Sequence, residues 1–153
     1  MIKALALAGV ALAVAACSGQ ADPVARFAGA WQSNCYADAD NSIYHHRDAT
    51  TISETSGVVL TYTGSLSTYA SGDCSGAAVD VADYAGTIRI TGSMPIGSVT
   101  AYTAQMTPED QEPGQNILAL SAGKLVFGKK GSPLDADGYQ TVLDGDEQLS
   151  PVR

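Results

Sequence analysis

Positive charges are scarce in this 153-residue chain, in which eight Lys and Arg residues stand against sixteen Asp and Glu residues. The formal net charge is −8. Because nucleic acids are polyanions, this balance argues against a nucleic-acid partner. It also argues against peripheral binding to anionic lipid through surface charge. A charged partner, if there is one, is therefore expected to be cationic.

The chain also lacks the short motifs that mark common catalytic sites. It contains no G-x-S-x-G, no P-loop, no H-E-x-x-H and no dinucleotide-binding fingerprint. Its Ser, His and Asp residues fall in no recognisable catalytic frame, and carboxylates are too numerous to single out a pair. We therefore expect no enzymatic activity and no cofactor. An unassigned hydrolase is the enzymatic alternative.

Histidine is confined to two adjacent positions, His45 and His46. In a strand, adjacent side chains point to opposite faces, so the two imidazoles cannot share a metal without a bulge. His46 and Asp48 would share a face, but two ligands are too few for a structural zinc site. A polar strand end or loop explains the segment better, and we expect no metal there.

A second candidate metal site lies near the C-terminus. Five residues fall at positions 1, 3, 5, 6 and 12 of an EF-hand-like loop: Pro133, Asp135, Asp137, Gly138 and Asp144. The first of these is Pro instead of Asp, the last is Asp instead of Glu, and the flanks are strand-like. A tight Asp-Gly turn is the better account, which leaves Asp135 and Asp137 as weak calcium candidates.

The N-terminal apolar run, over residues 4–14, is too short to span a membrane. About eleven helical residues cover roughly half of a ~30 Å hydrocarbon core, and Lys3 precedes them. This arrangement is typical of a signal peptide, which we place at residues 1–16.

The leader ends in Ala15-Ala16-Cys17, which resembles the bacterial lipobox. The resemblance implies cleavage before Cys17, diacylation of its thiol, with palmitate among the attached chains, and acylation of the new amino group. Such chains give stable anchoring, at ~0.8 kcal/mol per buried CH₂ group. Ser18 after the cysteine implies sorting to the outer membrane in Gram-negative bacteria. The alternative is an ordinary secretory signal that leaves Cys17 as a free thiol.

Beyond the lipobox only two cysteines remain, Cys35 and Cys74. An even pair in an exported chain predicts one disulfide. It would close a loop of about forty residues and contribute about 4 kcal/mol in the chain-entropy model. Two free buried thiols are the alternative. A redox or zinc role is disfavoured because there is no C-x-x-C motif.

After Cys17 there is no sustained helical periodicity, except that residues 107–111 could form one helical turn. β-prone stretches recur at short intervals instead, separated by polar turns, with Gly64 as a candidate bulge. They span residues 27–36, 43–53, 58–63, 66–69, 77–81, 87–91, 99–106, 117–120, 124–127 and 139–143. This pattern predicts an all-β domain at 26–153, a single antiparallel barrel or barrel-like meander of about eight strands. Residues 17–25 would form the lipidated cysteine and a short tether.

Gly29-Ala30-Trp31 resembles the G-x-W at the start of the first strand in lipocalins and related calycin barrels. The resemblance implies a barrel in which Gly29 and Trp31 belong to the core and close one end. Most of the mature chain also resembles small uncharacterised bacterial lipoproteins, which share the lipobox, the early G-x-W and a cysteine pair. They also share a late Phe-Gly, here Phe127-Gly128, followed by Asp-rich turns.

Together these features predict a lipid-anchored protein of the cell envelope, at the outer membrane and facing the periplasm or cell surface. Its expected role is binding, either of a small apolar ligand in the barrel mouth or of an envelope partner. One alternative is inhibition of a basic enzyme such as lysozyme, because removal of the leader leaves a net charge of about −9. Another is a purely structural envelope lipoprotein. An apolar cavity under Trp31 would favour the carrier, and a filled core with an acidic groove would favour the inhibitor.

Overall fold

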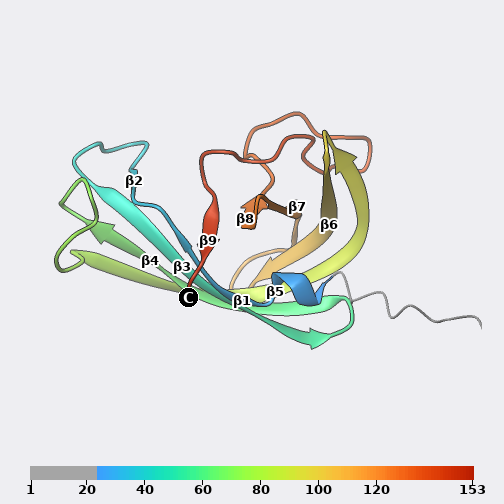
Figure 1. Ribbon diagram of the computed structural model, residues 1–153, viewed down its shortest axis with the longest axis horizontal. Coiled ribbons are helices and arrows are strands. Elements are labelled where there is room, and N and C mark those ends of the chain that lie inside the picture. Colours follow the sequence, from blue (N-terminus) through green and yellow to red (C-terminus); the bar gives the residue numbers. More distant parts are fainter. Residues whose placement is uncertain (1–23) are drawn as a thin grey trace, which may run out of the picture.

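Antiparallel strands form one sheet that closes into a barrel, as the sequence predicted (Figure 1). The structure is a computed structural model and describes residues 24–153. A short 3-10 helix, η1, comes first, and nine strands follow it. The bounds are η1 Ala25–Phe27, β1 Gly29–Ser33, β2 Tyr36–Ala37, β3 His45–Ser56, β4 Val59–Tyr69, β5 Asp80–Ile96, β6 Val99–Pro108, β7 Gly114–Ser121, β8 Lys124–Phe127 and β9 Leu149–Pro151.

The barrel closes through β1, which pairs antiparallel with β9 on one side and with β3 on the other. Strand β2 continues along β3 beyond the end of β1, so the two short strands take one place in the sheet. Eight strand positions therefore go around the barrel within the described residues. Closure leaves β1 and β9 without free edges, which would otherwise invite pairing with another chain.

The core follows the two-residue alternation of the strands. In the register of β3, β4 and β5, Ile52 lies opposite Tyr62, and Leu60 lies opposite Ile88. All four side chains are buried, whereas most of the side chains between them in sequence are exposed or only partly buried. The inward face is thus a continuous apolar surface around the barrel axis.

One end of the barrel is filled by the segment that enters it. Phe27 of η1 is fully buried and packs edge-on against Tyr102 of β6, with ring centroids 5.4 Å apart. Trp31 is 6% exposed, and its indole Nε1 donates a hydrogen bond of 2.9 Å to the Phe27 carbonyl. Val24, the first described residue, also packs in this core.

Gly29 adopts a φ of +146°, which L side chains rarely adopt. A Cβ atom there would lie 3.7 Å from the Trp31 indole nitrogen, an ordinary contact. The glycine is therefore needed for its backbone conformation, which turns the chain from η1 into β1 just before the indole.

A tight hairpin joins β7 and β8 around residues 121–123. Strands β7 and β8 are joined at Ala122 and Gly123, both of which have positive φ, +50° and +78°. Two central residues with positive φ are the mark of a type I′ turn, whose twist matches that of the flanking strands.

Two local predictions were wrong in the region of β4 and β6. Gly64 marks no bulge, because the register runs without interruption from Thr50 through Gly64 to Tyr84. The register shifts lie instead between Glu54 and Ser56 and between Ile90 and Gly92. The helical turn expected at 107–111 is also absent, since β6 extends to Pro108 and only a turn follows.

The last strand was also misplaced. Residues 139–143 form no strand; they make only isolated bridges within the loop that follows β8. Tyr139 and Leu143 pack instead on a second apolar cluster formed by Ala101 of β6 with Ile117 and Ala119 of β7. The strand that completes the barrel is β9, near the chain end, where Leu149 supplies a buried inward side chain.

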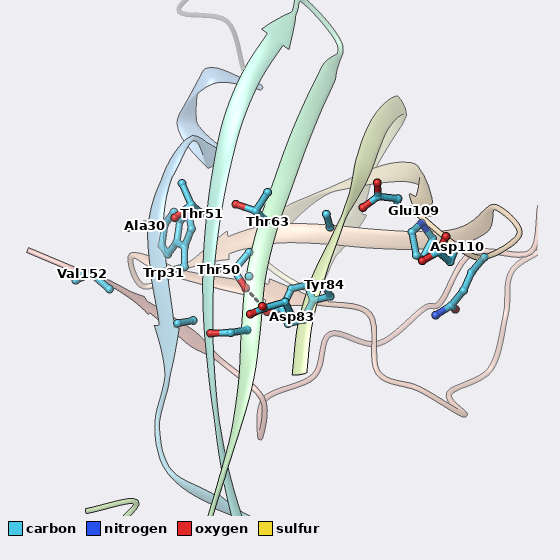
Figure 2. Close-up of a pocket in the computed structure, with 16 residues that line it drawn as sticks. Ala30, Trp31, Thr50, Thr51, Thr63, Asp83, Tyr84, Glu109, Asp110 and Val152 are labelled. Carbon is cyan, nitrogen blue, oxygen red and sulfur yellow. Dashed lines mark hydrogen bonds between the residues drawn. The ribbon is translucent and has the colours of Figure 1, made fainter. Parts of the chain in front are cut away.

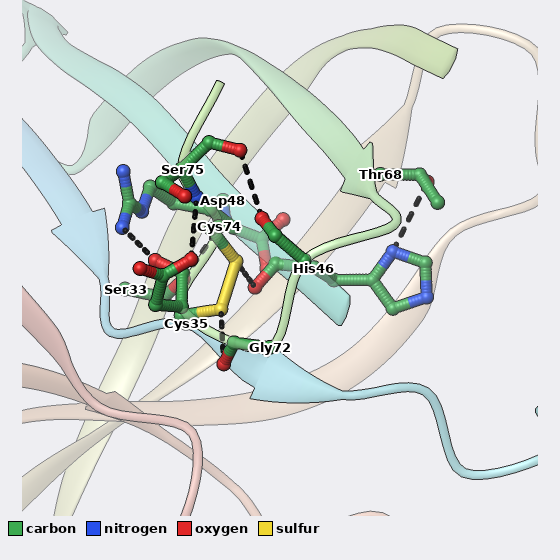
Figure 3. Close-up of a disulfide and its surroundings, with 11 residues drawn as sticks. Ser33, Cys35, His46, Asp48, Thr68, Gly72, Cys74 and Ser75 are labelled. Atoms are coloured by element: carbon green, nitrogen blue, oxygen red, sulfur yellow. Dashed lines mark hydrogen bonds between the residues drawn. A yellow bond between two sulfur atoms is a disulfide. The ribbon is translucent and has the colours of Figure 1, made fainter. Parts of the chain in front are cut away.

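The predicted disulfide between Cys35 and Cys74 is confirmed, with a Cα–Cα distance of 5.6 Å (Figure 3). Cys35 lies between β1 and β2, and Cys74 lies in the loop between β4 and β5. Because β3 runs between these two segments, the disulfide crosses β3 and ties the loop between β4 and β5 to the segment between β1 and β2.

The predictions of a leader and of a lipid anchor both concern residues 1–17. The predicted leader at 1–16 and the predicted lipidation site Cys17 lie outside the described residues. From Val24 onward, no helix is long and apolar enough to cross a membrane.

Candidate ligand-binding site at the barrel mouth

A cavity of about 340 Å³ lies inside the barrel, at the end opposite the one that Phe27 and Trp31 fill. Its walls come from β1 to β9, at the end where β1, β6 and β8 finish and β7 and β9 begin. Its size lies at the small end of the range seen for ligand pockets. We call this space the mouth cavity.

The deeper wall of the mouth cavity is apolar. Ile52 and Ile88 are almost fully buried, and Leu149 of β9 is 7% exposed. Met106 of β6 and Phe127 of β8 are partly buried and pack against the core from the same end. An apolar molecule that entered the mouth would therefore meet aliphatic and aromatic carbon at the bottom.

Two tyrosines on β4 and β5 form one wall in a reciprocal arrangement. Tyr84 lies opposite Gly64, and Tyr62 lies opposite Gly86. A Cβ atom on Gly64 would come within 2.5 Å of the Tyr84 ring, and one on Gly86 would come equally close to the Tyr62 hydroxyl. Each ring thus occupies space left by a glycine on the neighbouring strand, and the ring centroids are 6.2 Å apart.

Hydroxyl groups and a carboxylate line the outer part of the cavity. The Tyr36 hydroxyl donates a hydrogen bond of 2.7 Å to Oδ2 of Asp48. The Tyr84 hydroxyl shares a hydrogen bond of 2.5 Å with Thr50, and the Asp48 backbone N–H donates to the Ser33 hydroxyl. These bonds fix the polar groups in place before any ligand arrives.

Burial and the neighbouring carboxylate both act on these phenols. Burial, the hydrogen bond to Asp48 and the charge of Asp48 raise the pKa of Tyr36 far above its usual value. Burial is also the main cause of the raised pKa of Tyr84. Both hydroxyls therefore stay protonated at neutral pH and remain hydrogen-bond donors.

Glu147 brings a second carboxylate to the mouth cavity from the segment before β9. Partial burial raises its pKa, and the charges of Asp144 and Asp48 raise it further. Within residues 24–153 the salt bridges are His46–Asp38 and Lys129–Asp146, so neither Asp48 nor Glu147 belongs to one. Lys130 is the one cationic side chain among the residues that line the cavity, and it is exposed.

The candidate metal residue His46 lies beyond the mouth, beside the disulfide. Its Nε2 is 2.8 Å from Oδ2 of Asp38, and its Nδ1 is 3.1 Å from the Thr68 hydroxyl, as Figure 3 shows for the latter. Asp48, the other residue of this candidate metal site, accepts a hydrogen bond from the Tyr36 hydroxyl instead. Both ring nitrogens are therefore engaged in holding the loop after β2 against β3 and β4.

The other candidate metal residues form a turn. Oδ1 of Asp135 accepts backbone hydrogen bonds of 2.9 Å from Asp137 and from Tyr139, and Gly138 has a φ of +87°. This is the tight Asp-Gly turn that the sequence favoured. The part of the chain that the structure describes contains no group of three or more His, Cys, Asp or Glu side chains placed to hold a metal ion.

A second hollow, with a volume of about 650 Å³, lies along the outer side of the sheet (Figure 2). Trp31, Thr50 and Tyr84 belong to its lining, and the last two line the mouth cavity as well. Small outward-facing side chains of β1, β3, β4 and β5 form its base, among them Ala30, Thr51 and Thr63. Acidic side chains stand around it: Asp83, Glu109 and Asp110. We call it the outer groove. An acidic groove is one of the two features expected to favour the inhibitor; the other, a filled core, is not met at the mouth cavity.

Sequence reasoning found only part of the mouth cavity. Asp48 was singled out, but as a metal candidate, and Tyr36 and Tyr84 were given no role. Alternation along β3 could have placed Asp48, Thr50 and Ile52 on one inward face. No signal pointed to Glu147, because the strand that follows it was not recognised.

Comparison of the chain with protein-family models, with curated proteins and with solved structures gave no match.

Proposed function

We propose that the protein binds a small, largely apolar ligand in the mouth cavity. The observation that carries the proposal is the cavity itself, about 340 Å³ with an apolar bottom and fixed polar groups nearer the opening. Well-packed cores leave few voids larger than a water molecule. A hollow of this size with this division of polarity is typical of a ligand pocket.

An apolar cavity under Trp31 was the feature expected to favour a carrier. The hollow that Trp31 lines is the outer groove, with acidic side chains around it, and the mouth cavity that supports the proposal is a different one. Trp31 and Phe27 fill the opposite end, and Trp31 does not line the mouth cavity. The ligand would therefore enter from the end away from η1.

The proposal can be tested with N-phenyl-1-naphthylamine, an uncharged probe whose fluorescence rises in apolar surroundings. The full-length chain is made by cell-free synthesis under oxidising conditions, so that no acyl chain competes for the cavity. We expect saturable fluorescence enhancement. The Met106→Trp variant, which fills part of the cavity, should lose most of it.

Met94→Trp is the matched control, because Met94 is also partly buried but belongs to the second apolar cluster and lines no part of the mouth cavity. This variant should bind the probe as the unaltered chain does. Equal loss in both variants, or no saturable binding to the unaltered chain, would contradict the proposal.

A second candidate function is inhibition of a basic enzyme such as lysozyme through the outer groove. Asp83, Glu109 and Asp110 give this groove a negative charge that a cationic protein would complement. Replacing these three residues by Asn, Gln and Asn should abolish any inhibition of lysozyme by the full-length chain. Inhibition that the triple variant keeps, or its absence in the unaltered chain, would exclude this function.

A further inference from the structure

We propose that the ligand of the mouth cavity carries a protonated amine, which Asp48 and Glu147 hold while its apolar part rests on the deeper wall. This inference rests on the proposed binding function and specifies its ligand. Such a ligand is a small cationic amphiphile, with one charged end and one apolar end.

The first step is the charge balance at the opening. Asp48 and Glu147 both line the cavity, and no salt bridge within residues 24–153 neutralises either one. Each is close enough to the other for its charge to matter, because Asp48 is among the causes that raise the pKa of Glu147. A bound ammonium would relieve this repulsion, whereas a bound carboxylate would add to it.

The second step is hydrogen bonding. Tyr36 donates to one oxygen of Asp48 and so holds the carboxylate in a fixed orientation at the cavity wall. An ammonium group offers three donors and no acceptor, which suits a carboxylate and the acceptor lone pairs of the Thr50 and Tyr84 hydroxyls. A ligand with only acceptor oxygens would find fewer partners.

The third step weighs the opposing charge. Lys130 also lines the cavity and could attract an anionic ligand such as a fatty acid. Its side chain is exposed, and of the charges that act on Glu147 it is the weakest. Because exposed charges are screened by solvent and salt, Lys130 is expected to guide an anion less strongly than the two carboxylates guide a cation.

The test compares three ligands with the same chain length, namely octylamine, octanol and octanoate. Each ligand is titrated into the full-length chain with bound N-phenyl-1-naphthylamine, at pH 7 and low salt, and the concentration that displaces half of the probe is measured. We expect octylamine to act at about one-tenth of the octanol concentration, since hydrogen bonds to charged groups are the strong ones. Octanoate should be the weakest of the three.

Variants separate charge from shape. Asp48→Asn and Glu147→Gln should each weaken displacement by octylamine several-fold more than displacement by octanol, which carries no charge. Asp83→Asn, which removes one carboxylate from the outer groove instead, should keep the preference. A preference that survives in both cavity variants would show that these carboxylates do not select the ligand and would overturn the inference.

The outcomes also separate this inference from the function on which it rests. Equal displacement by octylamine and octanol, or stronger displacement by octanoate, overturns the amine assignment while the cavity remains a ligand site. Absence of probe binding to the unaltered chain overturns both.

Discussion

The reciprocal packing of tyrosine over glycine on β4 and β5 gives a sharp test through Gly64→Ala. A Cβ atom at this position would lie 2.5 Å from two atoms of the Tyr84 ring and 2.6 Å from the Ala49 carbonyl oxygen. Non-bonded carbon atoms prefer separations of about 3.5–4.0 Å. The ring could swing away, but the Ala49 oxygen belongs to the backbone of β3 and cannot move without disturbing the register.

The expected cost has two parts. Adding a methyl group to a tightly packed site typically costs about 1–3 kcal/mol. Moving the Tyr84 ring would also weaken its hydrogen bond to Thr50, worth a further 0.5–1.5 kcal/mol or so. We therefore expect Gly64→Ala to lower the free energy of unfolding by about 2–4 kcal/mol.

Equilibrium unfolding in urea, monitored by tyrosine near-ultraviolet circular dichroism, measures this change. Gly114→Ala on β7 is the matched control, because a Cβ atom there meets nothing within 4 Å and the backbone has no positive φ. The control should be neutral or slightly stabilising, as Gly→Ala is at permissive sites. If Gly64→Ala stayed within about 0.5 kcal/mol of the unaltered chain, the packing argument would be refuted, because surface substitutions alone vary by that amount.

Three further predictions concern the disulfide, the anchor and the cavity carboxylate. Reduction of Cys35–Cys74, whose sequence separation is 39, should lower the free energy of unfolding by about 4 kcal/mol in chemical denaturation; an unchanged midpoint would contradict the bridge's role. Cys17→Ser should release the protein from carbonate-washed membranes, and a variant that still sediments with them would exclude the lipid anchor. Binding of octylamine should weaken as the pH falls through the raised pKa of Glu147, because only the ionised carboxylate holds an ammonium; octanol binding should stay flat, and a parallel decline for both ligands would count against the role of Glu147. The groups that act on Glu147 besides Asp48 are Asp144, Asp146 and Lys130.

The strands that local sequence defines were predicted well. Val59, Leu60 and Tyr62 belong to a β-prone run with clear turn signals, and Ala122-Gly123 sits between two apolar runs as a hairpin turn does. The disulfide followed from chemistry instead of pattern, since two cysteines remained in an exported chain. In each case the information lies within a few residues or in composition.

What the sequence could not reveal depends on closure of the sheet. Strand β9 has three residues, includes Pro151, and has no apolar alternation to mark it. It forms by pairing with β1 on one side and with β8 on the other. Leu149 lies opposite Ser33 of β1 and opposite Leu125 of β8. Glu147 reaches the cavity only because this strand follows it, so both features were missed together.

The mouth cavity also depends on where large side chains face glycines across the sheet. Tyr62 and Tyr84 are large enough to fill the barrel at this end, yet each lies against a glycine of the adjacent strand and so stays at the wall. At the other end no such glycine partners Trp31, and its indole packs with Phe27 to close the barrel. The same kind of residue thus lines a hollow at one end and fills the other, and the difference lies in Gly64 and Gly86. A methyl group added at Gly64 or Gly86 should push a tyrosine ring toward the barrel axis. We therefore expect a single Gly→Ala change to lower both the free energy of unfolding and the affinity for a ligand in the mouth cavity.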